Sequence, residues 1–325
     1  MRYGKIAGND KPISRIVQGT SIPPVSMRHR DGCFALFDAV FAAGVTAFDT
    51  AHQYGDGDAE RLLGQWMQER GIREKIFILS KCAHHTQDRK RVTPYDITSD
   101  LMDSLARLRS DYIDLYLMHR DDPSVPVGPL VEEFNAHLAA GRIRAYGGSN
   151  WSVERIQAAN EYAHAHGLVP FTVSSPNFSF AAQVRPPWQD CLTISGPQGQ
   201  AARDWYAQAQ MPLFTWSSFA GGFFSGRFRR DNLDSFSDEL DKLSVSSYAR
   251  EDNFERLDRA HQLAAAKGLT VPQIALAFVL NQPLNIFALV GSHSGAELEE
   301  NAVACDVTLS AAEMEWLDLK SDVRP

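Results

Sequence analysis

Several features of secreted, membrane-bound and nucleic-acid-binding proteins are missing from this 325-residue sequence. It has four scattered cysteines, Cys33, Cys82, Cys191 and Cys305, without a CxxC pair, so we expect reduced, mostly buried thiols and no disulfide framework. No stretch reaches the roughly 18 apolar residues of a membrane span, and the N-terminus lacks the apolar core of a secretory signal. The net charge of -8 argues against nucleic acid and anionic membranes as partners. A cytoplasmic protein is the simplest expectation.

Short β-rich runs alternate with longer amphipathic stretches along the chain. Strands are predicted at 16–20, 45–50, 75–81, 112–119, 143–149, 169–174, 213–217 and 286–291. Helices are predicted at 32–43, 59–69, 94–108, 128–140, 153–166, 198–208, 253–267, 271–281 and 295–304, with an irregular polar stretch at 227–249. The helices are long enough for parallel crossovers, and the strands are continuous apolar runs, as expected when both faces are covered.

Eight strands alternating with helices predict an α/β protein, a (β/α)8 TIM barrel, in a single domain over residues 1–325. The rival fold is a doubly wound open sheet, which normally carries GxGxxG after its first strand. The sequence has no such motif, since the glycines at 55 and 57 lack a third partner and do not follow the first strand.

Ionisable side chains stand where the predicted strands end, which is the face that carries the active site of such barrels. Asp49 ends the second strand and Tyr54 follows it, Lys81 ends the third strand, and His119 ends the fourth. A lysine ammonium beside a phenol favours the phenolate, and a carboxylate beyond the lysine keeps it charged. A neutral histidine then holds the substrate oxygen against the phenol. This set predicts catalytic proton transfer to a carbonyl oxygen, or from an alcohol, during hydride transfer.

A metal-dependent hydrolase is a competing interpretation. It would use His84, His85, His119 and Asp121, but such sites often open with a histidine pair on the first strand, which has none. The two neighbouring histidines are also free to point apart. We therefore expect no metal site.

Five motifs follow one another along the chain: FDTAHQYG (48–55), ILSK (78–81), YIDLYLMHR (112–120), GGSNW (147–151) and WSSFAGGFFSGRF (216–228). In this order they resemble the aldo-keto reductase superfamily, and the resemblance extends over nearly the whole chain. It implies a reductase of aldehydes or ketones, or a dehydrogenase of the matching alcohols, with a catalytic tetrad at Asp49, Tyr54, Lys81 and His119. The resemblance also leaves an alternative interpretation, a non-catalytic regulatory barrel that senses the nicotinamide cofactor.

The resemblance implies NADP(H) as the favoured cofactor, bound in a groove without a Rossmann fold. Its contacts would come from loops after several strands: Gly19, Thr20, Asp49, Ser149, Asn150, Ser175, Trp216, Ser217, Phe219, Gly221, Gly222, Arg227, Gly291, Ser292, His293, Glu297, Glu300 and Asn301. Within this set Ser149 and Asn150 would hold the nicotinamide amide, and Trp216 would stack on the ring.

Three positions depart from the family pattern. Ser175 stands where a glutamine is usual, and Ser218 stands where a proline is usual. His293, with Glu297 nearby, stands where a basic residue usually clamps the 2′-phosphate. Because histidine is largely neutral at pH 7, this change keeps NAD(H) possible.

The expected substrate is a small carbonyl compound or alcohol, and the sequence predicts no narrower substrate class. It predicts no oligomeric state. Substrate contacts are predicted at Ser21, Tyr54, His119 and Trp151. The long excursion after the seventh strand is also of the length that tends to be functional.

Overall fold

The computed structural model describes all 325 residues. Eight parallel strands form a closed barrel in the order β10, β3, β4, β5, β6, β7, β8, β9, which confirms the (β/α)8 fold. The strands are β3 (Ile16–Gly19), β4 (Ala47–Asp49), β5 (Phe77–Cys82), β6 (Leu115–Met118), β7 (Tyr146–Ser149), β8 (Val173–Ser175), β9 (Leu213–Thr215) and β10 (Ile286–Val290). All their residues except Gly19 are buried, as the apolar runs predicted.

The chain packs as two compact units. The first unit comprises Met1–Ser175 and Gly291–Leu298, and the second comprises Pro176–Val290 and Glu299–Pro325. That the whole chain acts as a single domain stays a prediction.

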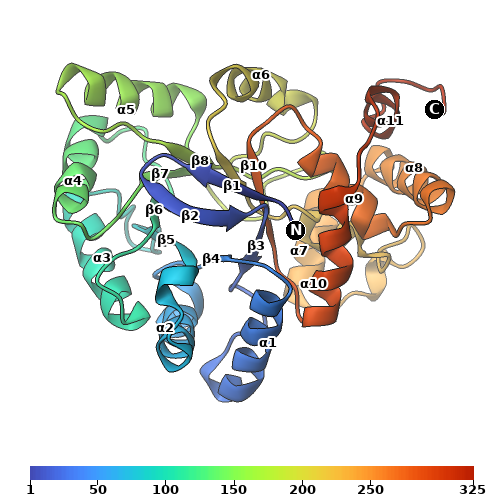
Figure 1. Ribbon diagram of the computed structural model, residues 1–325. Helices are drawn as coiled ribbons and strands as arrows, with labels where there is room; N and C mark the ends of the chain where they lie inside the picture. Colours follow the sequence, from blue (N-terminus) through green and yellow to red (C-terminus); the bar gives the residue numbers. More distant parts are fainter. The chain divides into compact units, whose positions relative to one another are not determined.

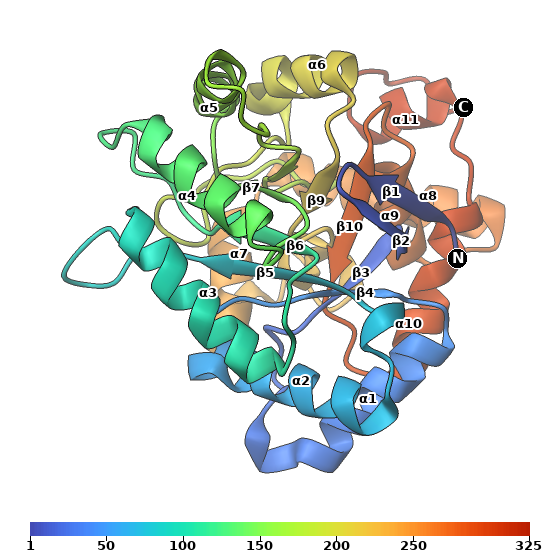
Figure 2. The same cartoon turned by 60° about the vertical axis from the view of Figure 1, so that its left-hand side comes forward.

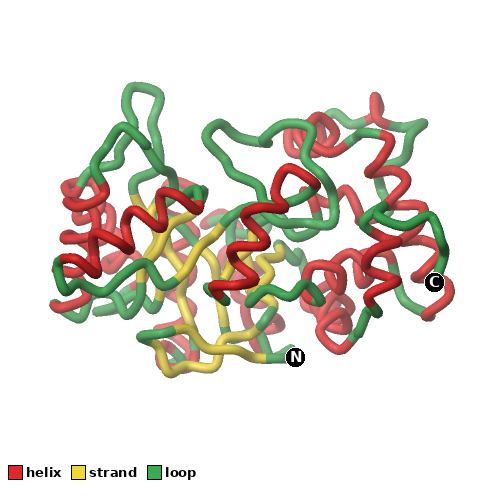
Figure 3. The backbone as a smooth tube through the Cα atoms, turned by 90° about the horizontal axis from the view of Figure 1, so that it is seen from above, coloured by secondary structure: helices red, strands yellow, loops and turns green.

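In the first unit, helices follow the strands in regular succession. They are α1 (Arg30–Ala42), α2 (Asp58–Arg70), α3 (Pro94–Leu108), α4 (Val127–Ala139) and α5 (Val153–Ala165), and each packs against the next (Figures 1 and 2). Figure 3 shows the same backbone from above, with helices in red, strands in yellow and loops in green. An aromatic cluster joins two helices to the sheet: the ring of Trp66 lies 5.4 Å from that of Phe37 and 5.2 Å from that of Phe48.

An N-terminal hairpin precedes the barrel and was not predicted. Its antiparallel strands β1 (Tyr3–Ile6) and β2 (Asn9–Ser14) are joined through Gly8, whose φ of 80° suits a glycine. From β2, the Lys11 ammonium lies 2.9 Å from a carboxylate oxygen of Asp114, the residue before β6. The hairpin is therefore anchored where strands begin, opposite the end at which the predicted catalytic residues stand.

The second unit contains α6 (Gln200–Ala209), α7 (Glu239–Tyr248), α8 (Glu251–Lys267), α9 (Val271–Leu280) and α11 (Ala311–Leu317), and α10 (Gly295–Ala302) follows β10. The prediction that 227–249 is irregular was wrong over α7. The carboxylate of Asp238 caps that helix by accepting from the backbone N–H groups of Leu240 and Asp241. Helix α11 was also missed.

Short 3-10 helices complete the chain. They are η1 (Met27–His29), η2 (Tyr54–Gly57), η3 (Arg73–Lys75), η4 (Pro197–Gly199), η5 (Ala220–Ser225), η6 (Leu233–Ser235) and η7 (Val303–Asp306). No single helix has the length and apolar character to cross a membrane; α8 and α9 meet those criteria only together, and they are bent by 100°.

Candidate active site

The centre of the site is the ammonium group of Lys81, which lies on β5 and is 2% exposed. It donates to a carboxylate oxygen of Asp49, to the backbone oxygen of Thr50 at 2.9 Å and to the hydroxyl oxygen of Tyr54 at 3.2 Å. Neighbouring parallel strands β4 and β5 bring these groups together, since Asp49 is paired in register with Leu79. The side chains that the sequence placed on separate strand ends therefore touch one another.

The loop that carries Tyr54 has an unusual backbone. Gly55, Asp56 and Gly57 follow with φ values of 56°, 53° and 88°. Such a left-handed conformation is costly for an aspartate, and strained residues of this kind concentrate at functional sites. The run turns the chain sharply between Tyr54 and the start of α2.

His119 follows β6 and is 6% exposed. Its ring makes edge contacts with Tyr54, at 5.6 Å between ring centroids, and with His84, at 4.6 Å. The Nδ1 atom of His119 is buried without a hydrogen-bond partner. The Nδ1 of His84 lies 2.8 Å from the backbone oxygen of His85 and, as the carbonyl can only accept, must carry the proton in that bond.

Burial sets the protonation states of these groups. It raises the pKa of the Tyr54 phenol above its ordinary value, although the Lys81 charge acts to lower it. Burial also raises the pKa of Asp49 against the lowering effect of Lys81. Burial and the charge of Lys81 hold the pKa of His119 well below its usual range, and burial lowers the pKa of His84 to about 4. At neutral pH the phenol is protonated and both imidazoles are neutral.

The expected effect of Lys81 on Tyr54 thus has the predicted sign but is smaller than the effect of burial. The burial of Lys81 itself lowers its pKa, but Asp49 and Tyr54 more than offset this, so the net pKa of Lys81 is raised. Lysine therefore remains charged in the site.

After β7, the predicted amide contacts Ser149 and Asn150 lie beside His119. The Asn150 amide donates to the backbone oxygen of His119 and to the Ser149 hydroxyl, each at 3.2 Å, and Asn150 has a φ of 59°. The Ser149 hydroxyl donates to the backbone oxygen of Ser175 at 2.9 Å. Ser175, itself fully buried, thus enters this group through its backbone.

The predicted substrate residue Trp151 is only 1% exposed. Its indole N–H donates to the backbone oxygen of Arg120 at 3.2 Å, and its ring packs 5.0 Å from that of Phe171. These contacts give Trp151 a packing role, and its contact with substrate stays a prediction. Ser21, by contrast, is exposed.

Around β3, the hydroxyl and backbone N–H of Thr20 both donate to the backbone oxygen of Asp49 at 2.9 Å. Gly19 accepts from the Gln18 amide at 2.9 Å, and the same amide donates to the backbone oxygen of Ser292 at 3.1 Å. The structure therefore brings Gly19, Thr20 and Ser292 of the first unit into one hydrogen-bonded group.

The loop after β10 lies in the first unit up to Leu298. The backbone N–H of His293 donates to the carboxylate of Glu297 at 2.8 Å, so these two predicted residues are linked. His293 is exposed, whereas the Ser292 hydroxyl is buried without a partner. Gly291 precedes them, and Glu300 and Asn301 follow on α10 in the second unit.

In the second unit, the loop after β9 has several left-handed residues. Ser217, Ala220, Gly221 and Gly222 have φ values of 54°, 53°, 62° and 87°. A Cβ on Gly221 would collide with the hydroxyl oxygen of Ser244, so only glycine fits there.

Around this loop, the indole Nε1 of Trp216 is buried without a hydrogen-bond partner. Phe219 is partly buried, and Arg227 is exposed and pairs with Asp241 at 2.7 Å.

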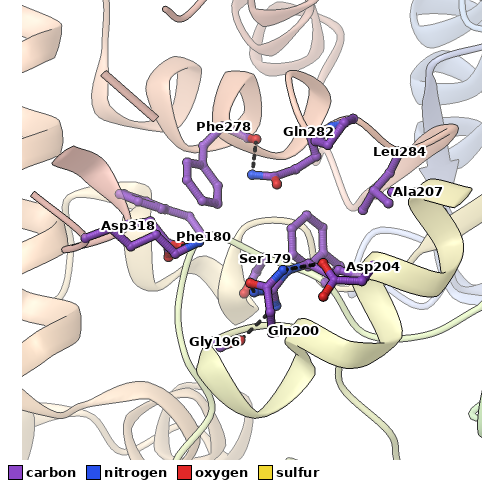
Figure 4. A pocket seen from close by; sticks show the side chains of 14 residues that line it. Ser179, Phe180, Gly196, Gln200, Asp204, Ala207, Phe278, Gln282, Leu284 and Asp318 are labelled. Atoms are coloured by element: carbon purple, nitrogen blue, oxygen red, sulfur yellow. Dashed lines mark hydrogen bonds and ion pairs between the residues drawn. The ribbon is translucent and has the colours of Figure 1, made fainter. Parts of the chain in front are cut away.

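A cavity of about 230 Å³ lies elsewhere in the second unit (Figure 4). Apolar side chains such as Phe180, Phe278 and Leu284 line it together with Gln200 and Asp204. None of the four predicted catalytic residues belongs to it, so we assign it no part in the chemistry.

No cluster of three histidine, cysteine or acidic side chains is arranged to hold a metal ion. Asp121, a ligand in the competing hydrolase interpretation, has both carboxylate oxygens bound by Arg155 at 2.8 and 2.9 Å.

The family model named Aldo/keto reductase family matches residues 27–322. The chain belongs to this family. It is 26% identical over 299 residues to norsolorinic acid reductase stcV of Emericella nidulans, covering 88% of this chain and 70% of that protein. It is 25% identical over 313 residues to a probable voltage-gated potassium channel subunit beta of rice, covering 94% and 92%.

A solved structure has the same fold at higher coverage. The aldo-keto reductase of Klebsiella pneumoniae, crystallised with NADPH, superimposes with a TM-score of 0.70 at 26% identity, covering 97% of this chain and 94% of that one. Family membership and the barrel therefore agree with the resemblance found in the motifs.

One feature of the site was not found from the sequence. Arg120 follows His119 directly and is 6% exposed, yet its guanidinium has no carboxylate partner. The two acids that follow it in the sequence are bound elsewhere, Asp121 by Arg155 and Asp122 by Lys90, which only the structure shows.

Proposed function

We propose that this protein reduces an aldehyde or ketone, or oxidises the matching alcohol, with NADP(H) and with Tyr54 as the general acid and base. The contact that carries this proposal is the Lys81 ammonium between the carboxylate of Asp49 and the hydroxyl of Tyr54. We further propose that the whole chain acts as one cytoplasmic domain on small-molecule substrates.

The residues present fit a nicotinamide cofactor. In the first unit, the Ser292 hydroxyl is buried without a partner, as a donor reserved for a ligand would be. In the second unit, the Trp216 indole N–H is likewise buried without a partner. The left-handed backbone at Gly221 and Gly222 suits close approach of phosphate oxygens. By family analogy, Ser149 and Asn150 would hold the nicotinamide amide, and Gly19, Thr20, Ser217, Phe219, Arg227, Gly291, His293, Glu297, Glu300 and Asn301 would contact the rest.

When bound, NADPH supplies a hydride to the carbonyl carbon. Tyr54 then donates its proton to the carbonyl oxygen, and the Lys81 charge stabilises the phenolate that remains. Asp49 keeps Lys81 charged and in place. His119, neutral at pH 7, orients the substrate oxygen toward the phenol.

A regulatory barrel is the second candidate, favoured by the similarity to a channel beta subunit. The two candidates differ in turnover. An intact Asp49, Tyr54, Lys81 and His119 set favours catalysis, because a protein that only senses cofactor needs no proton donor beside the nicotinamide.

The test compares NADPH consumption with a panel of aldehydes and ketones between wild type, Tyr54→Phe and Tyr95→Phe. Tyr95 is a matched control, since it is 76% exposed on α3. We expect kcat/KM to fall at least about 100-fold in Tyr54→Phe, the range that general acid catalysis supplies, and to stay unchanged in Tyr95→Phe. Equal rates for Tyr54→Phe and wild type would refute the role of the phenol.

A further inference from the structure

A buried positive charge beside the catalytic residues lacks a neutralising partner. The guanidinium of Arg120 makes one hydrogen bond within the protein, from Nη1 to the backbone oxygen of His119 at 2.9 Å. No carboxylate lies within 4.0 Å of it, although the residue is only 6% exposed. A buried charge without a partner is costly, so its presence calls for a reason.

Three acids of this region, Asp49, Asp121 and Asp122, are engaged with other partners. Both oxygens of Asp121 are bound by Arg155, and Asp49 is bound by Lys81. Asp122 accepts from Ser124 and pairs with Lys90 at 3.4 Å. These three acids therefore have cationic partners other than Arg120.

The hydrogen bonds place this guanidinium on the catalytic face. The backbone oxygen of His119 accepts from Arg120 and also from the amide of Asn150 at 3.2 Å. The two donors are therefore neighbours around one acceptor, next to the His119 ring that contacts Tyr54. The positive charge of Arg120 also contributes to lowering the pKa of His119 and of His84.

The guanidinium keeps donors available. Its Nε and Nη2 have no partner in the protein, and neither is among the polar atoms sealed from solvent. A planar guanidinium with two open N–H directions matches a carboxylate, which it binds through paired charge-assisted hydrogen bonds.

We propose that Arg120 binds a carboxylate on the substrate, so that this enzyme acts on oxo acids, aldehydes or ketones that carry a carboxylate group. The identification of the anion as part of a substrate rests on the proposed function. The existence of the anion site does not, because binding can be measured without turnover.

The kinetic test uses two aldehydes that differ mainly in charge, 4-carboxybenzaldehyde and methyl 4-formylbenzoate. We expect wild type to prefer the acid over the ester at least about tenfold in kcat/KM, and Arg120→Gln to lose at least 10-fold of that preference. Arg120→Lys keeps the charge without the paired hydrogen bonds. Its preference for the acid over the ester should lie between those of wild type and Arg120→Gln. Arg109→Gln is the control, since this exposed arginine of the first unit also bonds an uncharged partner, Gln68.

The binding test uses benzoate and benzamide with the NADPH-loaded protein, followed by calorimetry. We expect benzoate to bind wild type at least about tenfold more tightly than benzamide, and this difference to disappear in Arg120→Gln. Turnover of both aldehydes without a preference for the acid, together with equal binding of benzoate and benzamide, would overturn the inference and leave the proposed function intact.

If neither aldehyde is turned over but benzoate still binds in an Arg120-dependent way, the proposed reductase activity is refuted. The anion site at Arg120 is then retained. A variant Arg120→Gln that lost NADPH affinity while keeping the preference for the acid would assign Arg120 to the cofactor and refute the inference.

Discussion

The ammonium nitrogen of Lys81 lies 3.2 Å from the hydroxyl oxygen of Tyr54, and the same nitrogen is held by a carboxylate and a backbone carbonyl on its other sides. The lysine is therefore fixed before any substrate arrives. The phenol is the one partner of Lys81 that can gain or lose a proton without breaking this arrangement. This asymmetry leads to a prediction about pH.

Reduction should keep its rate up to about pH 10. The pKa of Tyr54 is raised above its ordinary value near 10, so the proton-donating phenol persists across the neutral range. Alcohol oxidation needs the phenolate and should rise steadily with pH. Profiles of kcat/KM in both directions test this, with the folded fraction measured at each pH. A loss of reduction with a midpoint below pH 8 would contradict it.

The hairpin anchor should contribute strongly to stability. Asp114 is fully buried and accepts from Lys11, Arg73 and the backbone N–H of Ile78. Asp114→Ala leaves two cations without their partner and should lower the free energy of unfolding by about 3 kcal/mol, as for other broken buried ion pairs. Urea unfolding measures this, with the exposed Asp111→Ala as the control. A change no larger than that of the control would exclude the anchoring role.

Cofactor choice should respond to His293. This side chain is exposed, and the resemblance to the family implies a basic residue at its position, so His293→Arg offers a permanent bidentate donor for a 2′-phosphate. We expect the preference for NADPH over NADH in Kd to rise about tenfold. His164→Arg, also exposed, adds the same charge elsewhere. If the preference for NADPH over NADH rises equally in both variants, the added net charge explains the rise and position 293 has no specific role.

Trp216 should report cofactor binding. If its indole stacks on the nicotinamide, Trp216→Ala should lose most of the tryptophan quenching caused by NADPH and bind it about tenfold more weakly, within the range of aromatic stacking and area burial. Trp205→Phe on α6 serves as the control. Undiminished quenching in Trp216→Ala would contradict the stacking assignment and point instead to Trp188, whose ring lies 5.8 Å from that of Trp216.

The sequence predicted elements best where local chemistry marks their ends. The helix over 94–108 matches α3 residue for residue, because the Thr93 side chain caps it and Pro94 begins it. The strand predicted at 169–174 was too long at its start. Val169 belongs to the apolar run but is 47% exposed, and the structure has a strand only at Val173–Ser175.

The N-terminal hairpin and α7 were not predicted because their sequences are largely polar. The hairpin over Tyr3–Ser14 has mostly half-buried and exposed residues, and Lys11 anchors it through Asp114, a hundred residues away in the chain. Gly8, a turn-forming residue between two short segments, was the available signal. Likewise, α7 lies in a polar stretch whose helical signal was the capping Asp238.

The site shows the same division. The four ionisable residues at strand ends could be named from their positions, because parallel strands bring their carboxyl ends to one edge. The open donors of Arg120 could not, because they depend on which acids Arg155 and Lys81 already hold. The sequence also did not show that burial raises the pKa of Tyr54 by more than Lys81 lowers it, because burial is a property of the assembled fold.

The division of the chain into two units has a practical meaning for redesign. Asp49, Tyr54, Lys81 and His119 all belong to the first unit, whereas the glycine-rich segment after β9 belongs to the second. Under the proposed function, libraries confined to residues 216–249 would vary the predicted cofactor loop and leave Asp49, Tyr54, Lys81 and His119, with the segments that carry them, unchanged. Variants selected from such libraries for a new specificity would still carry all four of these residues.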